Sequence, residues 1–203
     1  PAVNKIHVRF IGEIANTESL EDQVYALVLK PGLAPVTTVY SKPQFTHTAM
    51  SRWTKDFWIG GAPTTISIDH NLKYLAQTRF VYNYDTTKTI AESTLASEYA
   101  RWQGQAKDLY DAGGWQKLMG TAGGRSEIGP YPDWAVRWLY TGDYRMLQQT
   151  QGNADLSAAW PIHLREGRAG KNLLRTDPAS AGTGVGHVIS ISNRPTFRMS
   201  ALT

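Results

Sequence analysis

The chain has 203 residues, of which 41% are hydrophobic and 19% are charged, a balance typical of a globular protein that can bury a core. The net charge is +4, but the basic residues are scattered and match no nucleic-acid motif, so no specific nucleic-acid partner is expected. Cysteine is absent, which excludes disulfides and thiolate chemistry, and no apolar run is long enough for a membrane span.

Residues 1–68 have the pattern of short β-strands. In residues 5–14, Ile6, Val8 and Phe10 alternate with polar side chains, as in a strand with one buried face. Further strand-like pieces, separated by Pro43, Gly60–Gly61 and Pro63, are 23–30, 36–40, 44–50, 52–59 and 64–68. Short strands at this spacing predict an antiparallel β-sandwich-like part.

The pattern changes to helical spacing at Asp69, which is a suitable N-cap for a helix over residues 69–80. A second helical pattern covers residues 89–110. We therefore predict an α+β fold, with a mainly helical part over 69–203 and the division of the chain near residues 63–70. This helical part contains a glycine-rich loop (113–129) and an irregular C-terminal segment with a strand-like piece at 187–192.

Two helices joined by a very tight turn are predicted after the glycine-rich loop. Pro132 suits the first turn of a helix, and Gly142 suits its end. Asp143 is a good N-cap for the next helix, which should end near Trp160 because Pro161 follows. This arrangement is an αα-hairpin.

Several known motifs are approached but not matched. The string MGTAGGRS lacks the first glycine and the lysine of a phosphate-binding loop, and GRSEIG lacks the second glycine of a nucleophile elbow. The five histidines are dispersed, so no metal site follows from their spacing. No cofactor is expected.

The carboxylates of Glu127 and Asp155 are candidate acid/base residues, whereas two other aspartates are not. Asp133 and Asp143 are explained by helix capping. Glu127 instead lies in the loop beside Arg125, and Asp155 lies inside a helix, where aspartate is a poor helix former. Glycosidic cleavage needs such a pair of carboxylates. The alternatives are an exposed ion pair between Glu127 and Arg125, and an ordinary polar helix face for Asp155.

The third candidate catalytic residue is His163, which follows the second helix together with Arg165. Arg125, Arg165, Trp134 and Trp160 are the candidate substrate-binding residues, because guanidinium groups orient polar ligands and indoles stack on sugar rings. A structural histidine and core-filling tryptophans are the alternatives. We expect Arg125, Glu127 and His163 to lie within hydrogen-bonding or one-water reach, with Trp160 forming a wall.

The strings GRSEIGPYPDWAVRWLYTGD and AAWPIHLRE carry a resemblance. The segment Gly124 to Arg165 resembles one helical-hairpin unit of the α/α-toroid architecture found in many bacterial glycan-processing proteins. It is also similar to a string in uncharacterised bacterial proteins, in which a Gly-Arg-x-x-Ile-Gly-Pro loop precedes a helix, a Gly-Asp turn and a Pro-x-His-x-Arg ending. The resemblance implies contact with glycan but no assigned activity.

Two functions of different classes follow from these observations. The first is a glycan-binding or glycan-processing protein that acts outside the cell or in the periplasm. The second is a structural or assembly subunit of a filament, virion or surface layer, without catalytic activity. The first residue, Pro1, indicates a processed product or an excerpt. Seven Trp, ten Tyr and five Phe are many for a modest core, so we expect a homo-oligomer or contact with further polypeptide of the same protein.

Overall fold

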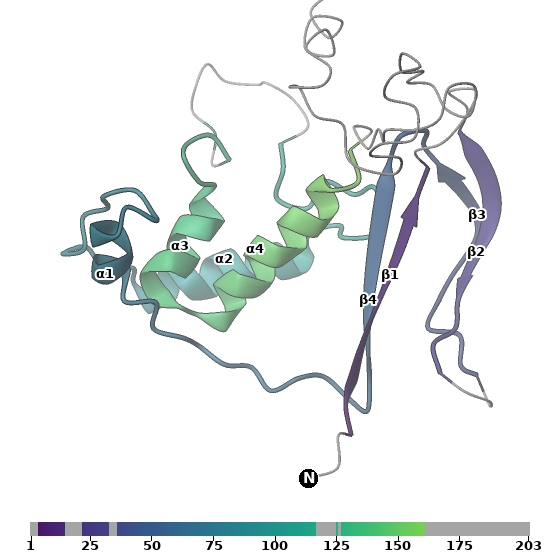
Figure 1. The fold of residues 1–203 in the computed structure, drawn as a ribbon, viewed down its shortest axis with the longest axis horizontal. Helices are drawn as coiled ribbons and strands as arrows, with labels where there is room; N and C mark the ends of the chain where they lie inside the picture. Colours follow the sequence, from purple (N-terminus) through teal and green to yellow (C-terminus); the bar gives the residue numbers. More distant parts are fainter. Residues whose placement is uncertain (1–3, 15–21, 33–35, 117–124, 126, 161–203) are drawn as a thin grey trace, which may run out of the picture. The chain divides into compact units, whose positions relative to one another are not determined.

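A computed structural model describes residues 4–14, 22–32, 36–116, 125 and 127–160, and this part of the chain contains both strands and helices (Figure 1). The described residues divide into two compact units. The strand unit holds residues 7–57 and 158–160, and the helical unit holds residues 4–6 and 58–157. The α+β class is therefore confirmed at this level, whereas the sandwich, the αα-hairpin and the boundary near residues 63–70 stay predictions.

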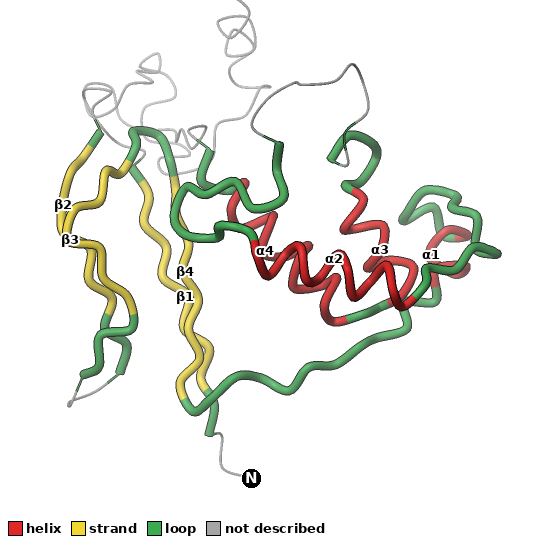
Figure 2. Tube along the Cα trace, turned by 180° about the vertical axis from the view of Figure 1, so that it is seen from behind, coloured by secondary structure: helices red, strands yellow, loops and turns green. Residues whose placement is uncertain are grey.

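Four strands form two small sheets (Figure 2). They are β1 (Ile6–Glu13), β2 (Gln23–Leu29), β3 (Tyr40–His47) and β4 (Arg52–Ile59). β1 pairs with β4, and β2 pairs antiparallel with β3. The strands predicted at 5–14, 23–30 and 52–59 are confirmed. In these segments apolar side chains alternate with polar ones or form a short apolar run, and both patterns favour a strand.

The prediction that Pro43 separates two strands is wrong, because this proline lies inside β3. The β2–β3 register shifts between Tyr25, which faces Phe45, and Leu27, which faces Lys42. Two residues of β3 therefore stand opposite one residue of β2, which is a β-bulge. Proline has no N–H for the ladder and is tolerated at such an irregularity. The buried side of β3 consequently changes from even-numbered to odd-numbered residues at Pro43.

The buried centre of the strand unit is a chain of hydrogen bonds between side chains of both sheets. The Trp53 indole donates to the Tyr25 hydroxyl at 3.3 Å, and this hydroxyl lies 2.8 Å from His47 Nδ1. His47 Nε2 lies 3.2 Å from the Ser51 carbonyl oxygen. A neutral ring with its proton on Nε2 satisfies both contacts, since it then donates to Ser51 and accepts from Tyr25. Phe45 packs edge-on against Trp53 and completes this core.

The segment Thr64–Ile68, predicted as a strand, is not part of a sheet among the described residues. Instead it runs as an extended connection towards the first helix, with every residue exposed (Figure 2). Its Ile68 N–H donates to the carbonyl oxygen of Gly142, at 2.9 Å. The segment thus attaches to a turn between helices and not to a neighbouring strand.

The helices of the second unit are α1 (Leu72–Gln77), α2 (Glu92–Gly104), α3 (Asp133–Thr141) and α4 (Tyr144–Ser157). α1 begins later than predicted, because Asn71 and not Asp69 accepts the capping hydrogen bond, from Tyr74 N. Asp69 accepts a hydrogen bond from the Asn71 N–H one step earlier. α2 buries Leu95 and Trp102, and it packs against α4.

Gly142 ends α3, and Asp143 follows before α4 begins, so two residues separate these helices. Gly142 has a φ of 61°, in the left-handed region that favours glycine. A Cβ atom at this position would lie 1.5 Å from the carbonyl oxygen of Ile68. Glycine is therefore required twice, by the conformation of the turn and by the close approach of the connecting segment.

The free energy of unfolding is expected to decrease as the pH falls from 7 to 5. Burial lowers the pKa of His47 below its ordinary value of 6.5, although the Ser51 carbonyl and the Asp22 carboxylate oppose the shift. The unfolded chain therefore takes up this proton first, and stability is lost as the pH falls from 6.5 towards the lowered folded pKa. Urea unfolding of His47→Gln should show a flatter pH dependence. The parent chain, measured under the same conditions, is the reference, and equal pH dependences of the two chains would contradict the assignment to His47.

Gly142→Ala should destabilise the helical unit by about 3 kcal/mol or more, since both a left-handed conformation and a steric clash must be relieved. Gly61→Ala is the matched control: its φ is +101°, but nothing lies within 4 Å of the added Cβ. Backbone strain alone should lower its stability by about 1–3 kcal/mol. Thermal unfolding of both variants measures the difference, and equal losses would contradict the contact with Ile68.

Candidate functional site

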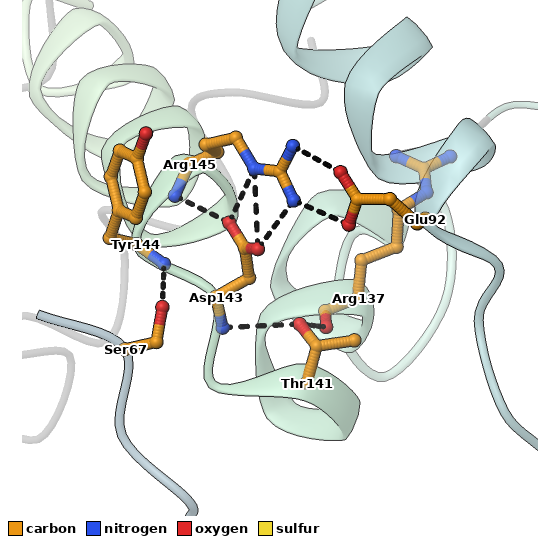
Figure 3. A network of polar contacts seen from close by, with 7 residues as sticks. All are labelled: Ser67, Glu92, Arg137, Thr141, Asp143, Tyr144 and Arg145. Carbon is orange, nitrogen blue, oxygen red and sulfur yellow. Dashed lines mark hydrogen bonds and ion pairs between the residues drawn. The ribbon is translucent and has the colours of Figure 1, made fainter.

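The guanidinium group of Arg145 connects α2 with the start of α4 (Figure 3). Its Nη1 and Nη2 donate to the two carboxylate oxygens of Glu92, at 2.7 and 2.8 Å. Its Nε and Nη2 donate to Asp143, at 2.9 and 2.7 Å. Asp143 also accepts the backbone N–H of Arg145 and thereby caps α4, as predicted. The planar guanidinium group of Arg145 therefore binds two carboxylates, those of Glu92 and Asp143, which are far apart in the sequence.

The charges of this cluster stabilise one another. Hydrogen bonds from Arg145 lower the pKa of Asp143 and of Glu92 below their ordinary values. The hydrogen bonds to Asp143 and Glu92 in turn raise the pKa of Arg145. All three groups are ionised at neutral pH, so the cluster offers no carboxylic acid as a proton donor, and the lowered pKa values make its carboxylates weak proton acceptors. Its hydrogen bonds join α2 to the start of α4.

A second ion cluster lies along α2 and α3. Arg137 pairs with Glu98 of α2 at 3.2 Å and with Asp133, one helical turn earlier, at 2.5 Å. Arg101 is a further partner of Glu98. The Asp133 carboxylate accordingly contacts a basic side chain of its own helix, in addition to its favourable position in the first turn.

The loop before α3 is attached to α4 through Asn153. This fully buried side chain accepts the Gly114 N–H at 2.7 Å, and its backbone carbonyl accepts the Trp115 indole N–H at 2.8 Å. Trp115 packs edge-on against Trp134, which is only 2% exposed. Trp134, a candidate sugar-stacking residue, thus fills the core in this structure and presents no open ring face.

The structure brings two of the predicted site residues together. Arg125 Nε lies 3.5 Å from Glu127 Oε1, which also accepts the backbone N–H of Gln116 at 3.2 Å. The Glu127 side chain is only 5% exposed and that of Arg125 is 18% exposed. This ion pair is therefore largely buried, in contrast to the exposed ion pair that was the alternative.

The structure describes two of the other predicted site residues, Asp155 and Trp160. Asp155 lies in the last turn of α4, about 200° around the helix from Asn153, which holds the loop. Trp160 is 49% exposed and belongs to the strand unit. His163 and Arg165 lie outside the described residues. Their assembly around one cleft stays a prediction.

A row of four tyrosines, here called the tyrosine cluster, was missed by the sequence analysis. Its members are Tyr131, Tyr82, Tyr84 and Tyr140. The ring centroids of successive members lie 5.9, 6.5 and 5.8 Å apart, and each contact is edge-on. Tyr82 is 57% exposed, and its neighbour Phe80 is 79% exposed. The alternation of aromatic residues at 80, 82 and 84 was the available signal.

Asp85 is joined to the tyrosine cluster through its backbone. It follows Tyr84, and its backbone carbonyl accepts the Tyr140 hydroxyl at 3.0 Å. Its side chain is exposed and accepts two hydrogen bonds from Thr87, which lower the pKa of the Asp85 carboxyl. Desolvation raises the pKa of the Tyr84 phenol. At neutral pH the residue next to Tyr84 therefore carries an ionised, exposed carboxylate.

Comparison of the chain with protein-family models, with curated proteins and with solved structures finds no match. Within the described part of the chain, no group of three or more His, Asp and Glu side chains is arranged to hold a metal ion. The helices that the structure describes include none that is long and apolar enough to cross a membrane.

Arg145→Met should lower the free energy of unfolding by about 2 kcal/mol or more, because two carboxylates lose their shared partner and the Asp143 side chain is only 15% exposed. Arg101→Met is the control, since the Arg101 side chain is 52% exposed and its ion pair is worth less than about 1 kcal/mol. Chemical denaturation of both variants measures these values. Comparable losses would show that Arg145 has no special part in joining the helices.

Proposed function

We propose that this chain binds glycan through the tyrosine cluster and Asp85. The observation that carries the proposal is the row of edge-packed tyrosines, of which Tyr140 at one end donates its hydroxyl to the backbone carbonyl of Asp85, a residue whose side chain is exposed. Contacts between the rings hold each one in place, so a ligand would meet a surface that is already ordered. We also propose that the protein acts outside the cell or in the periplasm. The same proposal includes a sandwich-like strand part and an αα-hairpin formed by α3 and α4.

The chemistry of the tyrosine cluster suits a sugar. A pyranose ring presents C–H groups on its faces, which pack against aromatic rings, and hydroxyl groups at its edge, which need hydrogen-bond acceptors. Tyr82 supplies exposed ring surface, and the Asp85 carboxylate supplies a charged acceptor.

Binding is better supported than processing. A general acid must reach the glycosidic oxygen, whereas the Glu127 side chain is only 5% exposed and is engaged by Arg125 and Gln116. Catalysis by Glu127, Asp155 and His163 remains a separate hypothesis that this proposal does not need.

Tyr82→Ala should weaken glycan binding at least tenfold and leave folding intact, since the ring is more than half exposed. Asp85→Asn should weaken binding several-fold by removing the charge from the acceptor. Tyr74→Ala is the matched control, because Tyr74 is 59% exposed but lies outside the tyrosine cluster. A glycan array identifies the ligand, and titration calorimetry with that oligosaccharide measures the effects. A parent chain that binds nothing on the array, or equal affinities for Tyr82→Ala and the parent, would contradict the proposal.

The second function, a structural or assembly subunit, is favoured by a different observation. The connecting segment between β4 and α1 exposes Ile66 and Ile68, by 64% and 55%. Apolar side chains on an unpaired extended segment are typical of surfaces that bind another chain.

A further inference from the structure

Three polar atoms on one face of α4 are buried and have no hydrogen-bond partner among the described residues. They are Nε2 and Oε1 of Gln149 and Nδ2 of Asn153. Both side chains are 0% exposed, and they lie four positions apart, so they share one face of the helix. Buried amide groups are almost always hydrogen-bonded, because burial removes the bonds that they form with solvent. These two amides therefore need a partner that the described side chains and backbone do not supply.

The chemistry of the three atoms limits what this partner can be. The two amide nitrogens carry four N–H donors, whereas the carbonyl oxygen of Gln149 is an acceptor. A direct bond from Asn153 Nδ2 to Gln149 Oε1 would use this acceptor and leave both N–H groups of Gln149 without one. The partner must therefore accept hydrogen bonds from the amide nitrogens, and it must donate one to satisfy the Gln149 carbonyl.

The surroundings of Asn153 admit a small neutral partner. α4 packs against α3, whose Trp134 is buried (Figure 1). A Cβ atom added to Gly114 would lie 3.0 Å from Asn153 Nδ2 and 3.3 Å from the Trp134 ring. A methyl group at that distance from the nitrogen is crowded, whereas an oxygen atom at the same distance makes a hydrogen bond. An ion is excluded by a different argument, because burial of a charge without a counter-charge is far more costly than burial of a neutral group.

We propose that a buried water molecule binds beside Gly114 and bridges the amides of Gln149 and Asn153. It accepts a hydrogen bond from each amide nitrogen and donates one to Gln149 Oε1, and buried waters typically make about three hydrogen bonds. By binding Nδ2, the water fixes the orientation of the Asn153 amide, so that Oδ1 stays directed at the Gly114 N–H. Gln149 thus acts through water on the attachment of the loop to α4.

A crystal structure of the full chain, at a resolution that shows ordered water, tests the site directly. Electron density for one water oxygen is expected within about 2.7–3.2 Å of both Gln149 Nε2 and Asn153 Nδ2. A side-chain or backbone atom that binds these amide nitrogens overturns the proposal. The absence of density between the two amides, in a map that shows other buried waters, overturns it as well.

Thermal unfolding of Gln149→Met gives a second test, because the sign of the effect separates the two cases. Methionine keeps the length of the side chain and removes the amide. If water bridges the amides, the water and Asn153 lose a partner, and the melting temperature should fall by at least about 3 °C. If Gln149 has no partner, the loss of a buried polar group raises the melting temperature.

Gln148→Met is the matched control, because it makes the same exchange at the neighbouring exposed position of α4. Its melting temperature should differ from that of the parent chain by less than about 2 °C. A melting temperature of Gln149→Met that equals or exceeds that of the parent chain overturns the proposal.

Discussion

The guanidinium group of Arg145 is the interaction on which the order of the helical unit depends. Glu92 stands at the start of α2, and Asp143 stands immediately before α4, so one side chain fixes the relative position of two helix N-termini. Carboxylates at these places also favour the positive ends of the helix dipoles. The same turn carries Gly142, to which Ile68 is bonded. The ion cluster therefore lies beside the turn at which the connecting segment attaches.

The Arg145 cluster also explains why the conspicuous charges of this chain are poor candidates for catalysis. Arg145, Arg137 and their four carboxylate partners bind one another and join helices. A glycan surface, by contrast, needs ring faces that the core has not consumed. Among the described aromatic residues, Trp134 is buried, whereas Tyr82 of the tyrosine cluster and the nearby Phe80 are exposed. The exposed fraction of the side chain, and not the residue type alone, therefore distinguishes aromatic residues that fill the core from those that could contact a ligand.

Local patterns predicted the end of α3 and the start of α4, because Gly142 and Asp143 act through their own backbone neighbourhood. The strand with Pro43 was missed, since the bulge depends on the register with β2 and leaves little trace in the sequence of β3. The pairing of Arg145 with Glu92 spans 53 positions, and no spacing rule reaches that far. Arg125 and Glu127 were predicted as a pair because they are sequence neighbours, but their burial depends on the loop that Asn153 holds.

Pro43 and its bulge also affect how the strand unit reaches a single alignment. A pair of strands with strict alternation could slip by two residues and still keep its apolar side inward. In β3 the inward side changes at Pro43, from Tyr40 and Lys42 to Phe45 and His47. A slipped pairing would move the irregularity away from the proline and force a residue without an N–H into the regular ladder. The proline thus makes the misaligned hairpins less stable than the native one, and it does so before Trp53 of the last strand is available to form the core.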